Sequence, residues 1–486
     1  MRVTSAMIAS VLVLASLLAG CAGTAPTADM EQVSGRGLPQ VLSTEPEDLD
    51  YPALELETPE YERIEFANGM HGFFIEDHEI PIVDIHILIP TDFSPENREG
   101  VATLTARVMR NGGSEEWPGE RINEELEFVA ARVEVSAGTR RLDVHVNCLT
   151  KDLDLCLDVL EELLARPAFP EDVFELRRES LLEDVRREND EPRAVAWQEY
   201  RKSLYGDHPM GRDASVESVT TITRDDLVAF HRAYVAPDNA IIGIVGDVTR
   251  DEIVARLDEA LADWDGDPVE PEPVPELERD LEPSVQYAFK DINQAVIMIG
   301  HLGVNSRNED LPAIRVMNFI LGGGSFTSRI TQKVRTDEGL AYAAYSRYGD
   351  DPWTYGLFTA SSQTRADAAG RAAGLIVDII EEMKENGPTA DEFRRARDTY
   401  LNQQVFQYES KSEIVKRLIR YEYEGLPLDR PERFIEAIET MTIEDVKHAA
   451  AEYLHPDALT LLFVGDPEQF DVPLSTFGEV HEIDLE

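Results

Sequence analysis

Basic residues are scarce in this chain of 486 residues. It carries 45 Lys and Arg against 95 Asp and Glu, which gives a formal net charge of -50 and a pI near 4.4. Nucleic-acid binding and charge-driven adhesion to anionic lipid both depend on basic side chains, so this balance excludes them as main functions. Such acidity, with Arg outnumbering Lys, is typical of proteins adapted to high salt. An acidic cavity that attracts cationic peptides is the alternative.

Cysteine is almost absent, with three in the whole chain. No Cys-x-x-Cys pair exists, which excludes a metal knuckle or a dithiol redox motif of that type. Cys148 and Cys156 leave one possible disulfide. Cys148 ends an alternating stretch and Cys156 lies in a helix-like run, so we expect both to be buried as small apolar residues.

Long hydrophobic runs are missing beyond the N-terminus, so we expect no later membrane-spanning helix. Residues 1–20 combine Arg2 with an apolar stretch and predict a secretory signal peptide. The segment Leu18-Ala19-Gly20-Cys21 resembles a bacterial lipoprotein signal, so Cys21 is expected to carry a lipid anchor in the cell envelope. Ala22 after it resembles the pattern of retention at the periplasmic face of an outer membrane.

Several catalytic frames are missing as well. No nucleophile elbow is present, and 322–325 (Gly-Gly-Gly-Ser) lacks the Lys and spacing of a phosphate loop, so we expect it to end a helix. No two His residues are paired at helical spacing, and His71, His78 and His86 fall in strands or turns. We therefore expect no metal site among them. His208, in a Tyr-Gly-Asp-His-Pro turn, is expected to donate a structural hydrogen bond.

The chain falls into five predicted segments. After the signal peptide, residues 21–58 form a polar, flexible tether. A Pro/Glu-rich linker at 265–283 then separates two domains of similar size, 59–264 and 284–475.

The two domains are an internal repeat. Identical residues recur at a constant separation of 219 positions, which chance does not explain. The first set is Thr223, Asp226, Tyr234, Pro237, Asp238, Gly246 and Asp247, and the second is Thr442, Asp445, Tyr453, Pro456, Asp457, Gly465 and Asp466. The body is therefore a duplicated domain.

The order of elements is shared by the two halves. In the first, strands are expected near 61–66, 73–76 and 82–89, followed by a helix over about 100–110 that Gly112 and Gly113 close. The second repeats this with a strand at 295–300 and a helix near 311–321. The pattern predicts an α+β fold of two homologous domains, each an antiparallel-rich sheet with helices packed on one face.

Several motifs follow one another in a fixed order along the body. They are 68–70 (Asn-Gly-Met), 75–81 (Ile-Glu-Asp-His-Glu-Ile-Pro), 100–102 (Gly-Val-Ala), 135–138 (Val-Ser-Ala-Gly), 205–212 (Tyr-Gly-Asp-His-Pro-Met-Gly-Arg), 328–329 (Ser-Arg) and 335–342 (Arg-Thr-Asp-Glu-Gly-Leu-Ala-Tyr). Together they resemble the pitrilysin/insulinase family of zinc peptidases over nearly all of residues 59–470. The resemblance implies that the two domains form half of a clamshell.

The zinc motif of that family is degenerate here. Active members carry His-x-x-Glu-His on the helix that begins at Gly100, because residues four apart share one helical face and can hold one ion. This chain has Thr103, Ala106 and Arg107 in place of the first His, the Glu base and the second His. Arg107 has no free lone pair and brings a permanent cation, so this chain is expected to hold no metal and to be inactive on its own. The third ligand of the family falls on Asp184, which we expect to lie on a solvated helix or to pair with Arg107.

Arg335 and Tyr342 match positions that in the family reach the zinc site, bind substrate and stabilise the oxyanion. Some bacterial members divide these parts between two chains. The resemblance thus implies a non-catalytic subunit that pairs with a zinc-bearing paralogue and helps it bind peptide for endoproteolysis, with the zinc in the partner. The alternatives are a non-enzymatic binding or assembly protein, in which both residues are dispensable, and an autonomous peptidase with an unrecognised site. Local pairing of Arg335 with Asp337 or Glu338, and packing of Tyr342 in the core, would also account for these residues.

Overall fold

The computed structural model describes residues 59–278, 282–404, 408 and 410–485. The chain divides into two units, Met1–Glu55 and Leu56–Glu486, and every described element belongs to the second. The predicted signal peptide, the lipidation of Cys21 and the tether therefore lie outside the described residues. No helix among those described has both the length and the apolar character needed to cross a membrane.

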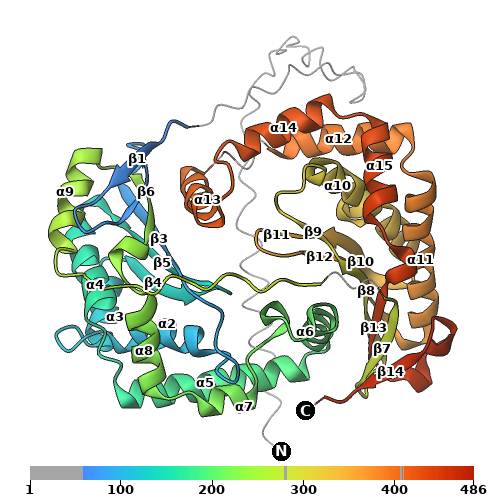
Figure 1. Ribbon diagram of the computed structural model, residues 1–486, viewed down its shortest axis with the longest axis horizontal. Coiled ribbons are helices and arrows are strands. Elements are labelled where there is room, and N and C mark those ends of the chain that lie inside the picture. Colours follow the sequence, from blue (N-terminus) through green and yellow to red (C-terminus); the bar gives the residue numbers. More distant parts are fainter. Residues whose placement is uncertain (1–58, 279–281, 405–407, 409, 486) are drawn as a thin grey trace, which may run out of the picture. The chain divides into compact units, whose positions relative to one another are not determined.

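A six-stranded sheet organises the first half (Figure 1). Its order is β1-β2-β6-β3-β5-β4, and all neighbours are antiparallel except the parallel pair β2 and β6. Burial alternates along β5, so successive side chains lie on opposite faces of the sheet. The strands are β1 (Glu62–Glu65), β2 (His71–Glu76), β3 (Ile82–Pro90), β4 (Arg132–Ala137), β5 (Arg141–Leu149) and β6 (Ile241–Gly246).

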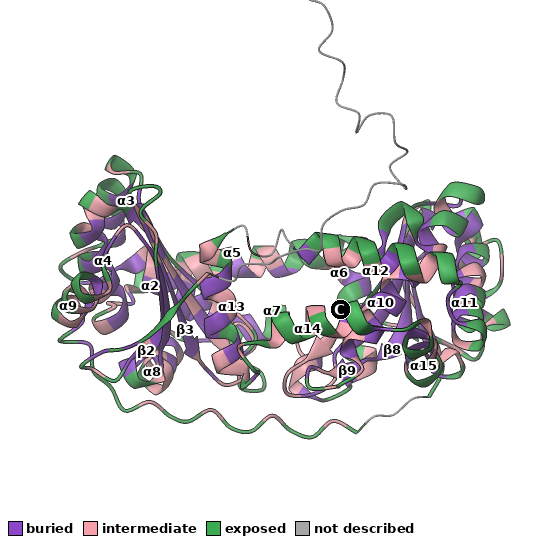
Figure 2. Cartoon of the chain, turned by 90° about the horizontal axis from the view of Figure 1, so that it is seen from above, coloured by how far each residue is buried: buried purple, intermediate pink, exposed green. Residues whose placement is uncertain are grey.

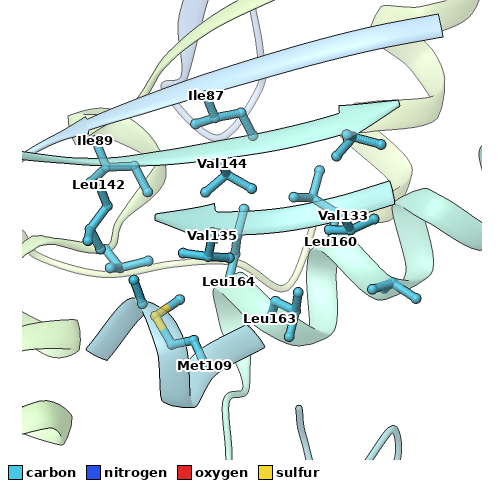
Figure 3. Packing of buried hydrophobic residues seen from close by; sticks show 14 of the residues in the cluster. Ile87, Ile89, Met109, Val133, Val135, Leu142, Val144, Leu160, Leu163 and Leu164 are labelled. Carbon is cyan, nitrogen blue, oxygen red and sulfur yellow. The ribbon is translucent and has the colours of Figure 1, made fainter. Parts of the chain in front are cut away.

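Helices cover the apolar face of this sheet. Ile87 of β3 and Val144 of β5 belong to one buried cluster with Met109 of α2 and Leu163 of α4 (Figure 3). Burial of such side chains stabilises the fold by roughly 1.5–3 kcal/mol each. The helices of this half are α2 (Val101–Gly112), α3 (Gly119–Phe128), α4 (Leu153–Ala165), α5 (Glu171–Asp190), α6 (Pro192–Tyr205), α7 (Val216–Thr221), α8 (Arg224–Tyr234) and α9 (Arg250–Ala260).

The second half contains a second six-stranded sheet with the order β10-β12-β8-β13-β7-β14. Buried residues are concentrated along the strands of both sheets (Figure 2). The strands are β7 (Ser284–Phe289), β8 (Gln294–Leu302), β10 (Ala341–Tyr348), β12 (Leu357–Arg365), β13 (Thr460–Gly465) and β14 (Val480–Ile483), and β9 (Val304–Asn305) pairs with β11 (Asp350–Asp351). The helices are α10 (Leu311–Asn318), α11 (Ala369–Asn386), α12 (Ala390–Gln404), α13 (Lys411–Glu424), α14 (Arg430–Thr440) and α15 (Ile443–Tyr453).

The internal repeat is present in the structure. Helices α8 and α15, and strands β6 and β13, have bounds that differ by the same 219 positions as the sequence identities. Both helices begin with a capping box, in which the Thr223 or Thr442 side chain accepts from the backbone N–H of Asp226 or Asp445. The repeated residues therefore mark the same helix start and the same fully buried central strand in both halves. The predicted α+β fold of two homologous sheet-and-helix domains is confirmed.

The glycine cluster of the second half differs from the expectation. The α-helix ends at Asn318, and Phe319–Gly323 continues as a π-helical turn instead of a helix that runs to Leu321. A Cβ atom on Gly322 would lie 2.4 Å from the backbone nitrogen of Ser346 in β10. Gly322 is therefore required for close approach to a strand, whereas we expected the cluster only to end a helix.

Each half contributes one helix to the sheet of the other. Helix α6 packs on β8 and β13, and the Tyr200 hydroxyl donates to the Phe358 carbonyl at 2.6 Å. Helix α13 packs on β2, β3 and β6 of the first sheet, where Val415 and Ile419 join a cluster with Leu88 (Figure 1). Both sheets are thus covered on their second face by a helix from the other half.

Candidate functional site

The degenerate zinc motif lies on α2, where the sequence placed it. Thr103 and Arg107 are partly exposed and Ala106 is buried. The Arg107 Nη1 donates to Asp184 Oδ2 at 2.8 Å across to α5, which confirms the expected pairing. A guanidinium thus engages the carboxylate that would be the third ligand, so these residues do not fit a zinc ion.

The Arg335 patch, defined here as Phe326, Arg335 and Tyr342, is a separate feature of the second half. The guanidinium carbon of Arg335 lies 5.5 Å from the ring centre of Tyr342 and 4.7 Å from that of Phe326. Tyr342 is 80% exposed and Phe326 is 58% exposed, so neither ring packs in the core. The patch therefore presents aromatic and cationic groups to solvent.

The acidic neighbours of Arg335 are engaged elsewhere. Glu338 pairs with Lys333 at 3.6 Å and with Arg371, and Asp337 accepts from Gln332 Nε2 at 2.8 Å. Among the described residues no ion pair to Arg335 is present. Arg335 therefore does not pair with Asp337 or Glu338, and Tyr342 does not pack in the core, so the local alternative is not what the structure shows. Their role in a partner's site stays a prediction.

A polar cluster on the first sheet was missed by the sequence analysis. Asp84 and His86 lie two apart on β3, and His145 and Asn147 lie directly opposite them on β5, so all four side chains are on one face. The His145 Nε2 contacts Asp84 Oδ1 at 2.6 Å, and the His86 Nε2 contacts Asp84 Oδ2 at 3.1 Å. Ser412 of α13 completes the cluster, 3.0 Å from the His86 Nε2 and in contact with Asp84.

The surroundings of this cluster set its protonation. Burial raises the pKa of the Asp84 carboxyl, but hydrogen bonds from His145, His86 and Ser412 outweigh it and hold that pKa well below its usual range. Burial lowers the pKa of His86. The Asp84 side chain is 13% exposed, that of His86 8% and that of His145 39%. The cluster therefore holds an ionised carboxylate beside His86, whose burial favours the neutral imidazole, with His145 partly open to solvent.

A cavity of about 670 Å³ opens beside the cluster. It lies between β3, β4, β5 and α13, and His86 and His145 form part of its lining. Arg141, Lys416 and Glu413 add charges of both signs. A small ligand that entered this cavity would contact the two imidazoles.

Two other expectations concern structural residues. The Nδ1 of His208 accepts from the Met210 N–H at 3.1 Å, so its Nε2 carries the proton and donates to the Pro275 carbonyl at 3.0 Å. The structural role predicted for His208 is confirmed. Cys148 and Cys156 are both free and buried, as expected, and a hydrogen bond with Cys156, together with burial, raises the pKa of the Cys148 thiol.

The polar cluster had a signal in the sequence. Asp84-x-His86 places two polar side chains on one face of an otherwise apolar strand, and His145 lies on the polar face of the next, alternating stretch. The expectation about His pairs covered helical spacing alone, because the strand register that makes His86 face His145 cannot be read from the sequence.

Comparisons with known proteins match consecutive parts of the chain to one peptidase family. Residues 77–215 match the family description "Insulinase (Peptidase family M16)", and residues 221–400 match "Peptidase M16 inactive domain". The chain is 26% identical over 399 residues to the non-peptidase homolog YmxG of Helicobacter pylori, covering 81% of this chain and 91% of that protein. It is also 26% identical over 326 residues to an uncharacterized zinc protease of Mycobacterium leprae, covering 64% of this chain and 70% of that protein.

A solved structure gives the same result. A peptidase M16 inactive domain from Pseudomonas fluorescens is 27% identical to this chain and aligns with a TM-score of 0.76 over 84% of this chain and 98% of that one. The two family matches include the residues of the motif on α2 and those of the Arg335 patch.

Proposed function

This chain belongs to peptidase family M16 as a homologue of the inactive type, and we propose that it is the non-catalytic subunit of a zinc endopeptidase whose zinc-bearing subunit is a paralogue. In this proposal Arg335 and Tyr342 enter the partner's active site and help it to bind peptide. The observation that carries the proposal is the contrast between the two sites. In the zinc motif Arg107 is paired with Asp184, whereas Tyr342 is exposed and Arg335 is partly exposed with no ion pair among the described residues.

The chemistry of the pair suits this role. A peptide carbonyl gains negative charge when it is attacked, and donors placed toward that oxygen stabilise the transition state. The Arg335 guanidinium offers fixed N–H donors and a permanent charge, and the Tyr342 hydroxyl offers one more donor. The ring of Tyr342 beside the guanidinium limits the directions in which Arg335 extends.

The exposed rings support an interface at the same place. Phe326 and Tyr342 beside Arg335 are each more than half exposed, and so is Tyr345, which follows Tyr342 on β10. Aromatic residues and Arg are enriched in the energetically important centres of protein interfaces.

We further propose that the lipid anchor at Cys21 holds the complex in the cell envelope, at the periplasmic face of an outer membrane.

The test is peptide hydrolysis by a mixture of this chain with an M16 paralogue that has an intact His-x-x-Glu-His motif. We expect the mixture to cleave an unfolded peptide faster than the paralogue alone. Arg335→Ala should lower kcat of the mixture by about 100-fold, the cost of removing one oxyanion donor in other enzymes. Tyr342→Phe, which removes only the hydroxyl, should also lower kcat.

A matched control is Arg347→Ala, because Arg347 is an exposed cation on the same strand as Tyr342. It should leave turnover unchanged. Co-purification of each variant with the paralogue separates loss of assembly from loss of catalysis. If the complex forms and Arg335→Ala retains full turnover, the catalytic role is wrong and an assembly role is favoured. Hydrolysis by this chain alone would favour an autonomous peptidase.

A further inference from the structure

We propose that Asp84, His86 and His145 bind one divalent transition-metal ion, Zn²⁺ in the first instance, at a site distinct from the degenerate zinc motif on α2. The three side chains could hold a metal ion because one ligand atom from each lies within 4.8 Å of the others. The proposal does not depend on Arg335 or Tyr342, so it can fail or succeed independently of the subunit role.

The strand register supplies the first argument. His86 and His145 are direct partners across the antiparallel pair β3 and β5, and their rings stack with centroids 4.4 Å apart and planes 11° from parallel. The Nε2 atoms of both rings contact the same carboxylate, one at each oxygen. The three potential ligand atoms therefore lie close together on two rigid strands, and one of the two parallel rings must turn before both lone pairs meet at one ion.

The distances suit a metal ion with small shifts. A tetrahedral ion about 2.1 Å from each ligand atom places those atoms about 3.4 Å apart. Asp84 Oδ2 and the His86 Nε2 are 3.1 Å apart, and Asp84 Oδ1 and the His145 Nε2 are 2.6 Å apart. Widening these contacts by less than about 1 Å makes room for the ion. The partly exposed His145 can supply this movement by a side-chain rotation.

The ligand set selects the class of ion. Two imidazoles and one carboxylate suit Zn²⁺ and neighbouring divalent transition metals, whereas Mg²⁺ and Ca²⁺ prefer oxygen ligands. This distinction matters in a chain with 95 Asp and Glu, because exposed carboxylates bind divalent cations weakly without any built site. The proposed site differs from such carboxylates by its two histidines.

Neighbouring groups support the ligands. The Asn147 Nδ2 donates to Asp84 Oδ1 at 3.3 Å, and Ser412 contacts both Asp84 and His86 from α13. Such second contacts orient metal ligands and raise metal affinity. The cavity lined by His86 and His145 leaves a position for a water molecule or a small ligand on the ion.

A catalytic Ser-His-Asp arrangement is the competing interpretation of the same residues. In such a triad the Asp and the Ser contact opposite nitrogens of the His ring. Here Ser412 and Asp84 both contact the Nε2 of His86, and they also contact each other. The geometry therefore favours shared coordination over proton relay.

The test uses the purified full-length chain, stripped with a chelator and then titrated with Zn²⁺ by calorimetry in high salt and excess Mg²⁺. We expect one tightly bound Zn²⁺ per chain. His145→Ala and Asp84→Asn should each weaken binding by about 100-fold or more, since each removes a ligand. Substitution with Co²⁺ adds a direct readout, because Co²⁺ in a tetrahedral protein site absorbs visible light much more strongly than the hydrated ion, and both variants should lose this absorption.

The matched control is His481→Ala, since His481 is exposed on β14 of the other sheet and outside the cluster. It should bind Zn²⁺ like the parent chain. Circular dichroism identifies any variant that fails to fold, and His145→Gln then takes the place of His145→Ala. Absence of a tight Zn²⁺ in the parent chain, or equal binding by folded His145 and Asp84 variants, overturns the proposal.

Discussion

At the scale of single residues, Arg107 in place of a zinc-ligating His replaces metal binding by an ion pair. Loss of a zinc ligand would alone weaken metal binding, but Arg107 also occupies Asp184 with a 2.8 Å ion pair. Both side chains are more than a third exposed, and exposed pairs contribute only about 0–1 kcal/mol to stability. The pair therefore opposes zinc binding at this position and adds little to stability.

A second residue, His231, predicts a pH dependence of stability. Burial lowers its pKa to about 4, and its Nε2 contacts the Leu164 carbonyl at 2.9 Å. His231 takes up a proton near pH 6.5 in the unfolded chain but only near pH 4 in the folded chain. Its contribution to the free energy of unfolding is therefore complete above pH 6.5 and is lost as the pH falls from 6.5 to 4. Between neutral pH and pH 4.5 the parent chain should lose about 2–3 kcal/mol of its free energy of unfolding through His231, and we expect His231→Gln not to show this loss.

Urea unfolding of both proteins at the two pH values measures this difference. The many carboxylates titrate in the same range, but they do so equally in parent and variant, so the difference isolates His231. His481→Gln, at an exposed position, should follow the parent. Parallel pH profiles for the parent and His231→Gln would show that His231 is not held neutral.

At the scale of elements, the exchange of α6 and α13 between the halves explains the second face of each sheet. Gly243 of β6 lies under α13, where an added Cβ would meet Val415 Cγ1 at 2.1 Å. The helix therefore approaches the strand more closely than any residue with a side chain allows. The same helix carries Ser412, so its seating also fixes one contact of the polar cluster.

Gly243→Ala is accordingly predicted to displace α13. The overpacking should lower the free energy of unfolding by about 1–3 kcal/mol, measured by chemical denaturation. Gly374→Ala is the control, because its Cβ would meet only Phe477, at 4.0 Å, and alanine favours the helix by up to about 1 kcal/mol. Equal stability of the Gly243 variant and the parent would contradict the close packing of α13.

The same scale shows where sequence patterns sufficed. The alternating strand Arg141–Leu149 and the helix Val101–Gly112 follow from periodicity and flanking glycines, which are local signals. The π-helical turn Phe319–Gly323 was not predicted, because it depends on the approach of β10 and not on the local sequence.

At the scale of the whole molecule, charge predicts how stability depends on salt. The net charge of -50 makes the folded chain repel itself, and screening reduces that repulsion. We expect Tm to rise when KCl increases from about 0.1 M to about 1 M, where the Debye length falls from about 10 Å to about 3 Å. Differential scanning calorimetry gives the change, and a non-ionic osmolyte of equal osmolality serves as the control. A Tm that falls with KCl would mean that screened ion pairs outweigh the repulsion.

The sequence by itself determined the family resemblance, the duplication and the loss of the zinc motif. These features rest on residue identity and on spacing along the chain, such as the offset of 219 and the chemistry of Arg107. It also identified Arg335 and Tyr342, through a motif within one segment.

Tertiary structure decided what depends on register and on contacts between distant segments. Asp84 and Ser412 are 328 positions apart, and His86 faces His145 only because β3 and β5 pair in one register. A slip of one residue would turn the histidines to opposite faces, and a local pattern does not specify the pairing. The polar cluster, the exchange of helices and the exposure of the Arg335 patch therefore required the folded chain.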